Sequence, residues 1–133
     1  TIFELHGNIE RNYCINCRTF YNEDFNPTKK IPHCKCGGLI RPDVVWFGEM
    51  LPVKELRHAE ECAANADVFF TIGTSAEVYP AAMLPIIAKR AGAYVVEINT
   101  KPTAISGELD EILTGKSGEI LDEILINIKK IRN

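Results

Sequence analysis

The sequence of 133 residues lacks three features that would assign it to a broad class of protein. Its apolar runs, such as residues 81–88, are far shorter than the roughly 20 residues that cross a bilayer. Basic residues are not in excess: 15 Lys and Arg against 18 Asp and Glu give a net charge of −3, which argues against nucleic-acid binding. No stretch has the pattern of a secretory signal, so we expect reduced thiols and a cytoplasmic location.

The composition is that of an ordinary globular protein, with 46% hydrophobic and 25% charged residues. The length suits one compact domain, or a domain with a small inserted module. The first residue is Thr1, and it leads directly into an apolar run at residues 2–5, which we interpret as a short strand. Such a strand at the start of the chain resembles one cut from a longer protein, so we expect a fragment.

Four of the five cysteines form two close pairs, Cys14-x-x-Cys17 and Cys34-x-Cys36. Residues 8–42 around them are polar, with turns expected at Pro27, Pro32 and Gly37, and are too poor in apolar residues for a core of their own. Each short pair can wrap one side of an ion, so the spacing predicts a tetrahedral Zn²⁺ site that holds this segment together. A disulfide is disfavoured in a reducing compartment.

The third zinc ligand has two candidates, because the second pair is one residue tighter than usual. A C-x-x-C spacing counted back from Cys36 falls on His33, which is also a competent zinc ligand. We prefer Cys34, since thiolates bind zinc strongly. The fifth cysteine, Cys62, lies on the apolar side of an expected helix and is interpreted as a buried residue.

Strand and helix patterns alternate over the rest of the chain, after a short β-prone run at residues 44–47. Helices are expected at 52–66, at 80–91 with Gly92 as the end, and from Ser117 as N-cap, with an apolar stripe of isoleucines and leucines. Strands are expected at 68–72, at 94–98 and at 111–114, the first buried on both faces. This order predicts an α/β fold with a parallel sheet flanked by helices.

Two loops of this sheet carry polar residues at the carboxyl ends of strands, where ligands of parallel α/β sheets bind. They are Gly73-Thr74-Ser75 and Asn99-Thr100-Lys101, and we expect them at one edge. Each is also compatible with a plain loop, and no G-x-G-x-x-G is present in the sequence. His6 is either a structural residue at a strand end or a general base.

Several motifs taken together resemble the sirtuins, the Sir2-type NAD-dependent protein-lysine deacylases. They are His6-Gly7, the two cysteine pairs, Arg41-Pro42-Asp43-Val44-Val45-Trp46-Phe47-Gly48-Glu49, the run from Gly73 to Ala82, and Ile98-Asn99. The resemblance runs through the whole chain in the order of the family. It implies a partial Rossmann-like sheet, formed by residues 1–7 and 43–133, with a small zinc-ribbon-like module inserted at residues 8–42.

The resemblance also implies roles for single residues. His6 matches the catalytic histidine, which acts on a ribose hydroxyl after the acyl-lysine oxygen has displaced nicotinamide; O-acyl-ADP-ribose is the second product. Val45 and Phe47 match the acyl-lysine tunnel, and Gly48 and Glu49 match a strand that pairs with the substrate backbone. The remaining matches are an NAD ribose loop at Gly73, Thr74 and Ser75, a second NAD segment at Asn99, Thr100 and Lys101, a contact near adenine at Ser117, and zinc ligands at Cys14, Cys17, Cys34 and Cys36.

The amino-terminal half of the family pattern, with its Gly-Ala-Gly phosphate loop, is absent from the sequence. The expected partners are therefore that missing half and an acylated-lysine protein or peptide. An alternative function is an inactive, zinc-stabilised half-domain that only binds partners. A zinc ribbon for nucleic acid is disfavoured, because acidic residues such as Glu10 and Glu23 balance the basic ones near the cysteines.

Overall fold

The computed structural model describes residues 1–21 and 31–131, and these form two compact units, Thr1–Glu55 and Leu56–Asn133. The turn expected at Pro27 lies outside the described residues, and the division into a module at 8–42 and a surrounding domain stays a prediction. No helix in the described ranges has both the length and the apolar character needed to cross a membrane.

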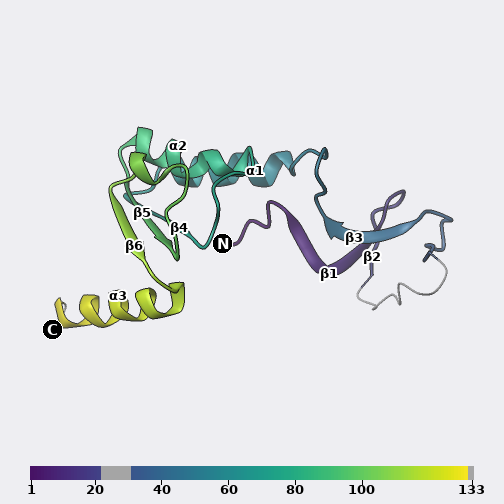
Figure 1. Cartoon of the computed structure of the whole chain (residues 1–133). Helices are drawn as coiled ribbons and strands as arrows, with labels where there is room; N and C mark the ends of the chain where they lie inside the picture. The colour runs from purple at the N-terminus through teal and green to yellow at the C-terminus, as the bar shows by residue number, and fades with distance from the viewer. Residues whose placement is uncertain (22–30, 132–133) are drawn as a thin grey trace. The chain divides into compact units, whose positions relative to one another are not determined.

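The first unit contains a three-stranded antiparallel sheet with the order β2-β1-β3 (Figure 1). Its strands are β1 (Gly7–Cys14), β2 (Phe20–Tyr21) and β3 (Ile40–Val44). Turns but no strand were predicted from the sequence at residues 8–42, and the described part of this segment contains strands. The strands escaped detection because they carry mostly polar side chains without an alternating apolar face, and they are held by backbone pairing.

Two strands expected in this unit do not form as predicted. Residues 2–5 lack strand structure and end in turns, with hydrogen bonds from Leu5 N to Phe3 O and from Gly7 N to Glu4 O. The run expected at 44–47 is a strand only as far as Val44. Both segments contain apolar, β-prone residues, but backbone groups in both form hydrogen bonds within local turns.

The buried core of the first unit is small. Among the described residues it consists of Cys14, Cys34 and Ile40, with the half-buried Tyr21 packed against them. Two of its three buried members are thiols, so hydrophobic burial alone contributes little to its stability. This agrees with the expectation that the segment depends on a metal ion.

The second unit contains a parallel sheet with the order β4-β5-β6, flanked by helices as predicted (Figure 1). The chain runs through α1 (Val53–Ala64), β4 (Val68–Ile72), the 3₁₀ turn η1 (Ala81–Met83), α2 (Leu84–Ala91), β5 (Tyr94–Asn99), η2 (Ser106–Glu108), β6 (Glu111–Thr114) and α3 (Ser117–Ile131). Gly92 ends α2 in the left-handed conformation, as expected. Ser117 is the first helical residue of α3, and the carbonyl of Lys116 accepts the first helical bond, so Ser117 is not the N-cap.

The core of this unit lies between the sheet and its helices. One buried cluster consists of Ala63 of α1, Ala88 of α2, Ala93 directly before β5 and Val95 within β5. A second consists of Ala76, Ile86 and Ile105. The central strand β5 is buried over residues 95–98. Short alanine side chains let the helices approach the sheet closely, which fixes β5 and with it the loop that follows.

Burial differs from the prediction at three places in this unit. In β4, expected to be buried on both faces, Val68, Phe70 and Ile72 are exposed. In α3, the apolar stripe is exposed at Leu125, Ile128 and Ile131, and Cys62 of α1 is also exposed. The apolar patterns of these segments therefore did not predict burial at these positions.

Gly7 is the residue at which a side chain is least compatible with the first unit. Its φ is +79°, and a Cβ atom there would lie 2.0 Å from the carbonyl oxygen of Asp43 on β3. Gly48 has a similar φ of +87°, but a Cβ atom there would meet nothing within 4 Å. Both positions have the backbone strain of a positive φ, but only Gly7 adds a steric clash. Substitutions at the two glycines therefore separate the two effects.

We predict that Gly48→Ala lowers the free energy of unfolding by about 1 kcal/mol, which is the cost of the left-handed conformation. Gly7→Ala should cost several times more, because the β1–β3 pair must also move apart. Urea unfolding followed by the fluorescence of Trp46, the single tryptophan, measures both. Equal losses in the two variants would show that the close approach at Gly7 does not constrain the sheet.

Candidate functional site

The four paired cysteines come together in the first unit. One ligand atom from each of Cys14, Cys17, Cys34 and Cys36 lies within 4.8 Å of all the others. The Sγ atoms of Cys14 and Cys36 are 3.5 Å apart, and so are those of Cys17 and Cys34. Cys14 and Cys34 are buried, whereas Cys17 and Cys36 are exposed.

Two tight backbone turns build this cluster. Arg18 N donates to the carbonyl of Cys14, and Gly37 N donates to the carbonyl of Cys34. Each turn brings the two thiols of one pair to the same side. A tetrahedron of sulfurs around zinc, with bonds of about 2.3 Å, has edges of roughly 3.8 Å, which is close to the observed separations. The geometry and the all-thiol donor set therefore fit a structural zinc ion.

Hydrogen bonds shift the acidity of these thiols in opposite directions. The hydroxyl and backbone of Thr19 lower the pKa of Cys17 to about 6. The backbone of Cys36, followed by the Tyr21 hydroxyl, lowers the pKa of Cys34. At Cys36, the backbone of Gly38 acts to lower the pKa, but the neighbouring thiols outweigh it and raise the pKa to about 12. Four thiolates at this distance repel one another, so a cation is needed before all of them ionise.

His33, the alternative third ligand, is placed differently. It is exposed, and its Nδ1 lies 2.9 Å from the carbonyl oxygen of Ile31. The metal-competent group found in the described part of the chain contains Cys34 and not His33. The structure thus brings together the four preferred ligands.

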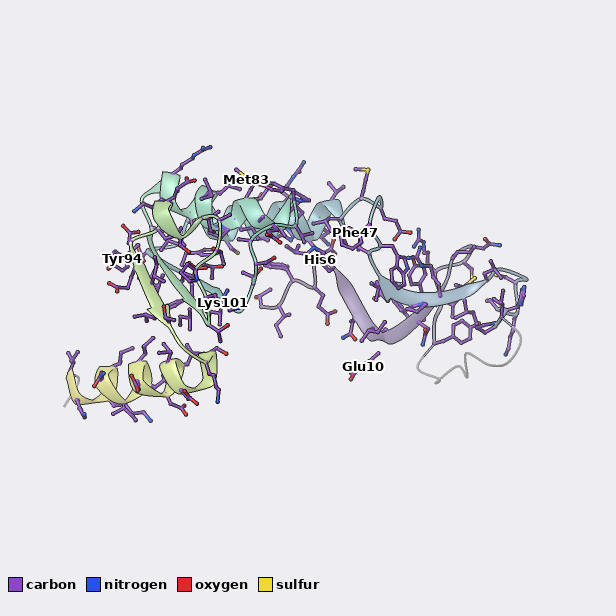
Figure 2. All side chains as sticks on the ribbon, in the orientation of Figure 1. His6, Glu10, Phe47, Met83, Tyr94 and Lys101 are labelled. Atoms are coloured by element: carbon purple, nitrogen blue, oxygen red, sulfur yellow. The ribbon has the colours of Figure 1, made fainter. Side chains whose placement is uncertain are left out.

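His6 lies directly before β1, and its ring is exposed (Figure 2). Its carbonyl accepts a hydrogen bond of 3.1 Å from Val45 N, and the next pair, Gly7 and Val44, is in register. The β1–β3 sheet therefore fixes the backbone of His6 beside the segment at residues 45–49. These two predicted site elements are neighbours in the first unit.

The segment at residues 45–49 forms a turn, with Glu49 N donating to Trp46 O. The strand implied for Gly48 and Glu49 is therefore not formed. Arg41 holds the Glu49 carboxylate with Nη1 at 2.5 Å from Oε1 and Nη2 at 2.9 Å from Oε2. Arg41, with Trp46 N as a second donor, lowers the pKa of Glu49 to about 2. This ion pair leaves Phe47 at the tip of the turn, with 96% of its surface exposed.

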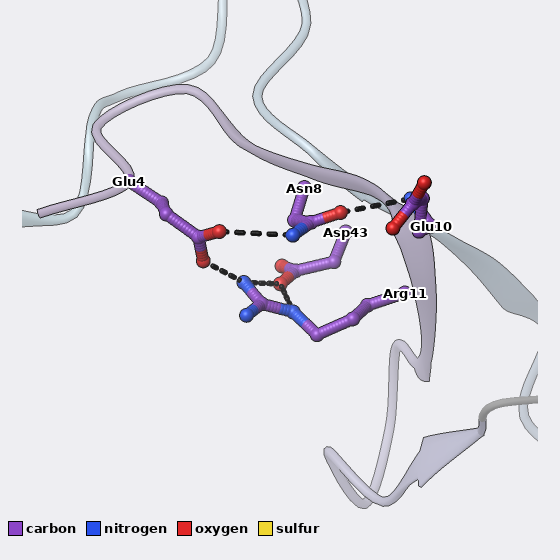
Figure 3. Close-up of polar contacts among 5 residues, drawn as sticks. All are labelled: Glu4, Asn8, Glu10, Arg11 and Asp43. Carbon is purple, nitrogen blue, oxygen red and sulfur yellow. Dashed lines mark hydrogen bonds and ion pairs between the residues drawn. The ribbon is translucent and has the colours of Figure 1, made fainter. Parts of the chain in front are cut away.

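A polar network that the sequence reasoning missed surrounds the start of β1 (Figure 3). Arg11 Nη2 lies 2.8 Å from Asp43 Oδ2 and 2.6 Å from Glu4 Oε2, and Asn8 Nδ2 donates to Glu4 Oε1 at 2.9 Å. Arg11 lies where the register of β1 and β3 shifts, between Asn8 and Asn12. It therefore braces an irregular part of the sheet next to His6. Arg11 and Asp43 are 32 residues apart, so no local spacing could have indicated the pair.

In the second unit, both predicted loops line one cavity of about 340 Å³. The cavity lies at the carboxyl ends of β4 and β5. In Figure 2, Lys101 of the cavity lies beyond the end of β5 that is opposite to Tyr94. The lining residues are Gly73, Thr74, Ser75, Glu77, Asn99, Thr100, Lys101, Pro102, Thr103 and Ala104. The sequence had predicted six of these ten. Ser117 is not among them.

The two loops are joined by direct hydrogen bonds. Asn99 Nδ2 donates to the carbonyl of Thr74 at 2.8 Å, and Gly73 N donates to the carbonyl of Ile98 at 2.9 Å. The parallel pairing of β4 with β5 explains this, because Ile72 and Ile98 are in register. The cavity offers hydroxyl groups, one ammonium group and the carboxylate of Glu77. The hydroxyl and ammonium groups suit the ribose and phosphate oxygens of a dinucleotide.

We predict one bound zinc ion per chain, lost in Cys14→Ser because a buried ligand is removed. Cys62→Ser is the matched control, since Cys62 is exposed and outside the cluster. Metal analysis of the purified variants measures both, and a chelator should unfold the first unit. Folding of the first unit without metal, or metal loss in Cys62→Ser, would contradict a structural zinc site at these four thiols.

Solved structures resemble this chain over its whole length. A Sir2 homologue in complex with NAD matches with a TM-score of 0.91 and 40% identity, covering 100% of this chain and 53% of the other. A complex described as Sir2–p53 peptide–NAD⁺ matches with a TM-score of 0.88 and 34% identity, covering 96% and 55%. The fold of this chain, a Rossmann-like sheet flanked by helices with a cysteine module, is therefore the Sir2 fold in part.

Curated relatives agree with these structures. NAD-dependent protein deacylase 2 of Pyrobaculum aerophilum is 48% identical over 131 residues, which cover 97% of this chain and 52% of the relative. NAD-dependent protein deacylase of Pyrococcus furiosus is 47% identical over 137 residues, covering 98% and 55%. The chain spans about half the length of the curated relatives it matches. The model of the Sir2 family matches residues 1–80, more than half of the chain, and the chain therefore belongs to the Sir2 family.

Proposed function

We propose that this chain is the carboxyl-terminal part of an NAD-dependent protein-lysine deacylase, which releases nicotinamide and O-acyl-ADP-ribose. The observation that carries the proposal is the cavity formed by the Gly73–Ser75 and Asn99–Lys101 loops, in a chain of the Sir2 family. Relatives of similar sequence are named NAD-dependent protein deacylases, and a similar Sir2 structure contains NAD. The substrate is an acylated-lysine protein or peptide.

The cavity residues are assigned to NAD. Thr74 and Ser75 present hydroxyls after β4, at the position where parallel sheets bind ribose and phosphate groups. Thr100 and Lys101 follow β5 on the facing loop, and the Lys101 ammonium suits a phosphate oxygen. Ser117 at the start of α3 is assigned to a backbone contact near adenine. Asn99 also fixes the Thr74 loop through its side-chain amide.

His6 is assigned as the general base. Its ring is exposed, as a group that exchanges protons with a substrate must be, and the β1–β3 sheet holds its backbone. As a general base, its imidazole would accept a proton from a ribose hydroxyl. The Arg11 network next to it supports the strand start from which His6 projects.

The turn at residues 45–49 is assigned to the acylated lysine and its peptide. Phe47 is an almost fully exposed aromatic side chain, and large exposed apolar groups commonly contact a ligand. Val45 and Phe47 would contact the apolar stem of the acyl-lysine. Gly48 and Glu49 would pair with the peptide backbone, with the Arg41–Glu49 ion pair keeping the turn in place. A similar structure, of Sir2Tm, contains a propionylated peptide.

An amino-terminal half of the same protein is proposed as the partner that completes the sheet. β4 is an edge strand of the described sheet, yet Val68, Phe70 and Ile72 on it are exposed apolar residues. The chain also covers only about half of the length of its relatives. Additional strands and helices would bury these residues and supply the phosphate loop.

In the complete protein, we predict that His6→Asn abolishes NAD-dependent deacylation, because an amide is not a base near neutral pH. Loss of general-base catalysis lowers the rate by about 10²- to 10⁴-fold. His33→Asn is the matched control, because His33 is exposed and outside the thiol cluster. Both variants should retain one zinc ion. Turnover of an acetylated peptide by His6→Asn at the wild-type rate would remove His6 from the mechanism.

Residues 1–133 alone should bind NAD weakly or not at all, whereas the complete protein should bind it in the micromolar range or tighter. The reason is that the described loops form one wall of a dinucleotide site. Isothermal titration calorimetry of both proteins measures the difference. Tight binding by residues 1–133 would refute the need for an amino-terminal half, and a complete protein without NAD binding would favour a zinc-stabilised half-domain that only binds partners.

A further inference from the structure

Three buried polar side chains lie together behind the second cavity loop. They are Thr71 on β4, Glu97 on β5 and Ser106 at the start of η2, with exposed fractions of 5%, 1% and 6%. Thr71 and Glu97 are register partners in the parallel pair, so their side chains lie on the same face of the sheet. No other polar or charged residue in the described part of the chain is this buried. A carboxyl group this deep is costly unless it is hydrogen-bonded.

Ser106 connects Glu97 to the loop. Its hydroxyl donates to Glu97 Oε2 and accepts a hydrogen bond of 2.7 Å from Thr103 N. Ser106 N in turn donates to the carbonyl of Thr103 at 3.2 Å, which closes a turn over residues 103–106. The hydroxyl thus joins the closed turn to the middle of β5.

The loop between β5 and this turn is the one that lines the cavity. At its start, Asn99 binds the Thr74 carbonyl on the facing loop; at its end, Ser106 binds Glu97. Residues 100–104 between these two anchors all line the cavity, whereas Glu97 and Ser106 do not. Removal of the second anchor therefore frees one side of the cavity without removing a lining group.

We propose that Glu97 is a positioning residue of the cofactor site: through Ser106, its buried carboxyl group holds the loop at residues 100–104 in the conformation that binds the dinucleotide. This inference rests on the proposed function, because it assigns NAD to the cavity. Glu97 itself is too deeply buried to touch a ligand. A hydrophobic side chain would fill its place in the sheet but would leave the Ser106 hydroxyl without its acceptor.

The test uses the complete protein that contains this chain. Ser106→Ala and Glu97→Leu should each weaken NAD binding about tenfold in calorimetry and raise the KM for NAD, with a smaller change in kcat and none in the KM for acetylated peptide. Glu97→Gln should stay within about twofold of wild type, because its amide oxygen still accepts from Ser106. Glu97→Leu/Ser106→Ala should match the single variants, since both remove the same link.

Val95→Ala is the matched control for a purely structural effect. Val95 is fully buried on the same face of β5, two residues before Glu97, and it belongs to a core cluster that includes no residue of the loop at 100–104. Even if Val95→Ala loses as much stability as Ser106→Ala, its affinity for NAD should stay at the wild-type value. A loss of affinity equal to that of Ser106→Ala would overturn the proposal, and so would wild-type affinity in Ser106→Ala.

Hydrogen exchange separates failure of this inference from failure of the proposed function. The Thr103 amide should exchange faster in Ser106→Ala and Glu97→Leu than in wild type, Glu97→Gln or Val95→Ala, whether or not NAD is present. If the wild-type protein does not bind NAD but the Thr103 amide behaves in this way, the proposed function fails while the anchor stands. Unchanged exchange in both anchor variants overturns the anchor itself.

Discussion

The close approach of four cysteine thiols is the constraint on which the first unit depends. Among the described residues, the buried apolar core of this unit is small, and two of its three members are thiols. A divalent cation at the centre would offset the repulsion among four thiolates with four bonds and would hold the two turns together. The same closure fixes β1 against β3, and these strands carry His6 at one end of the sheet and the thiols at the other. Metal binding thus supports the proposed general base at a distance.

The second unit depends on a different constraint, the in-register parallel pairing of β4 and β5. Parallel strands end at the same edge, so the loops that follow Ile72 and Asn99 have to meet. Close packing of alanines from α1 and α2 holds β5 in place. The loops are then tied by two side chains, Asn99 on one side of the cavity and Glu97 on the other. Rigidity at the strand ends is what a preorganised dinucleotide site requires.

Much of the fold was predictable because it follows from local spacing. The helix periods, the buried strand β5, the parallel order of the second sheet and the end of α2 at Gly92 are confirmed. The strand expected at residues 2–5 was wrong, because these residues end in local turns. Strand β1 was missed, because polar strands without an alternating pattern carry no periodic signal. The exposure of β4 and of the α3 stripe also differed from the prediction, since burial depends on which elements pack against a residue and not on its own apolar character.

The sequence by itself determined which chemical groups are present and how near they lie along the chain: two cysteine pairs, a histidine before a glycine, and polar loops after two strands. Short-range spacing was sufficient there, because a turn or a strand end places such groups within a few residues. The folded structure was needed to show which distant groups meet where no motif indicates it, such as Arg11 with Asp43. It also decided that Glu97 is buried against Ser106. The physical reason is that strand register and loop closure set these contacts, and neither is encoded in local periodicity.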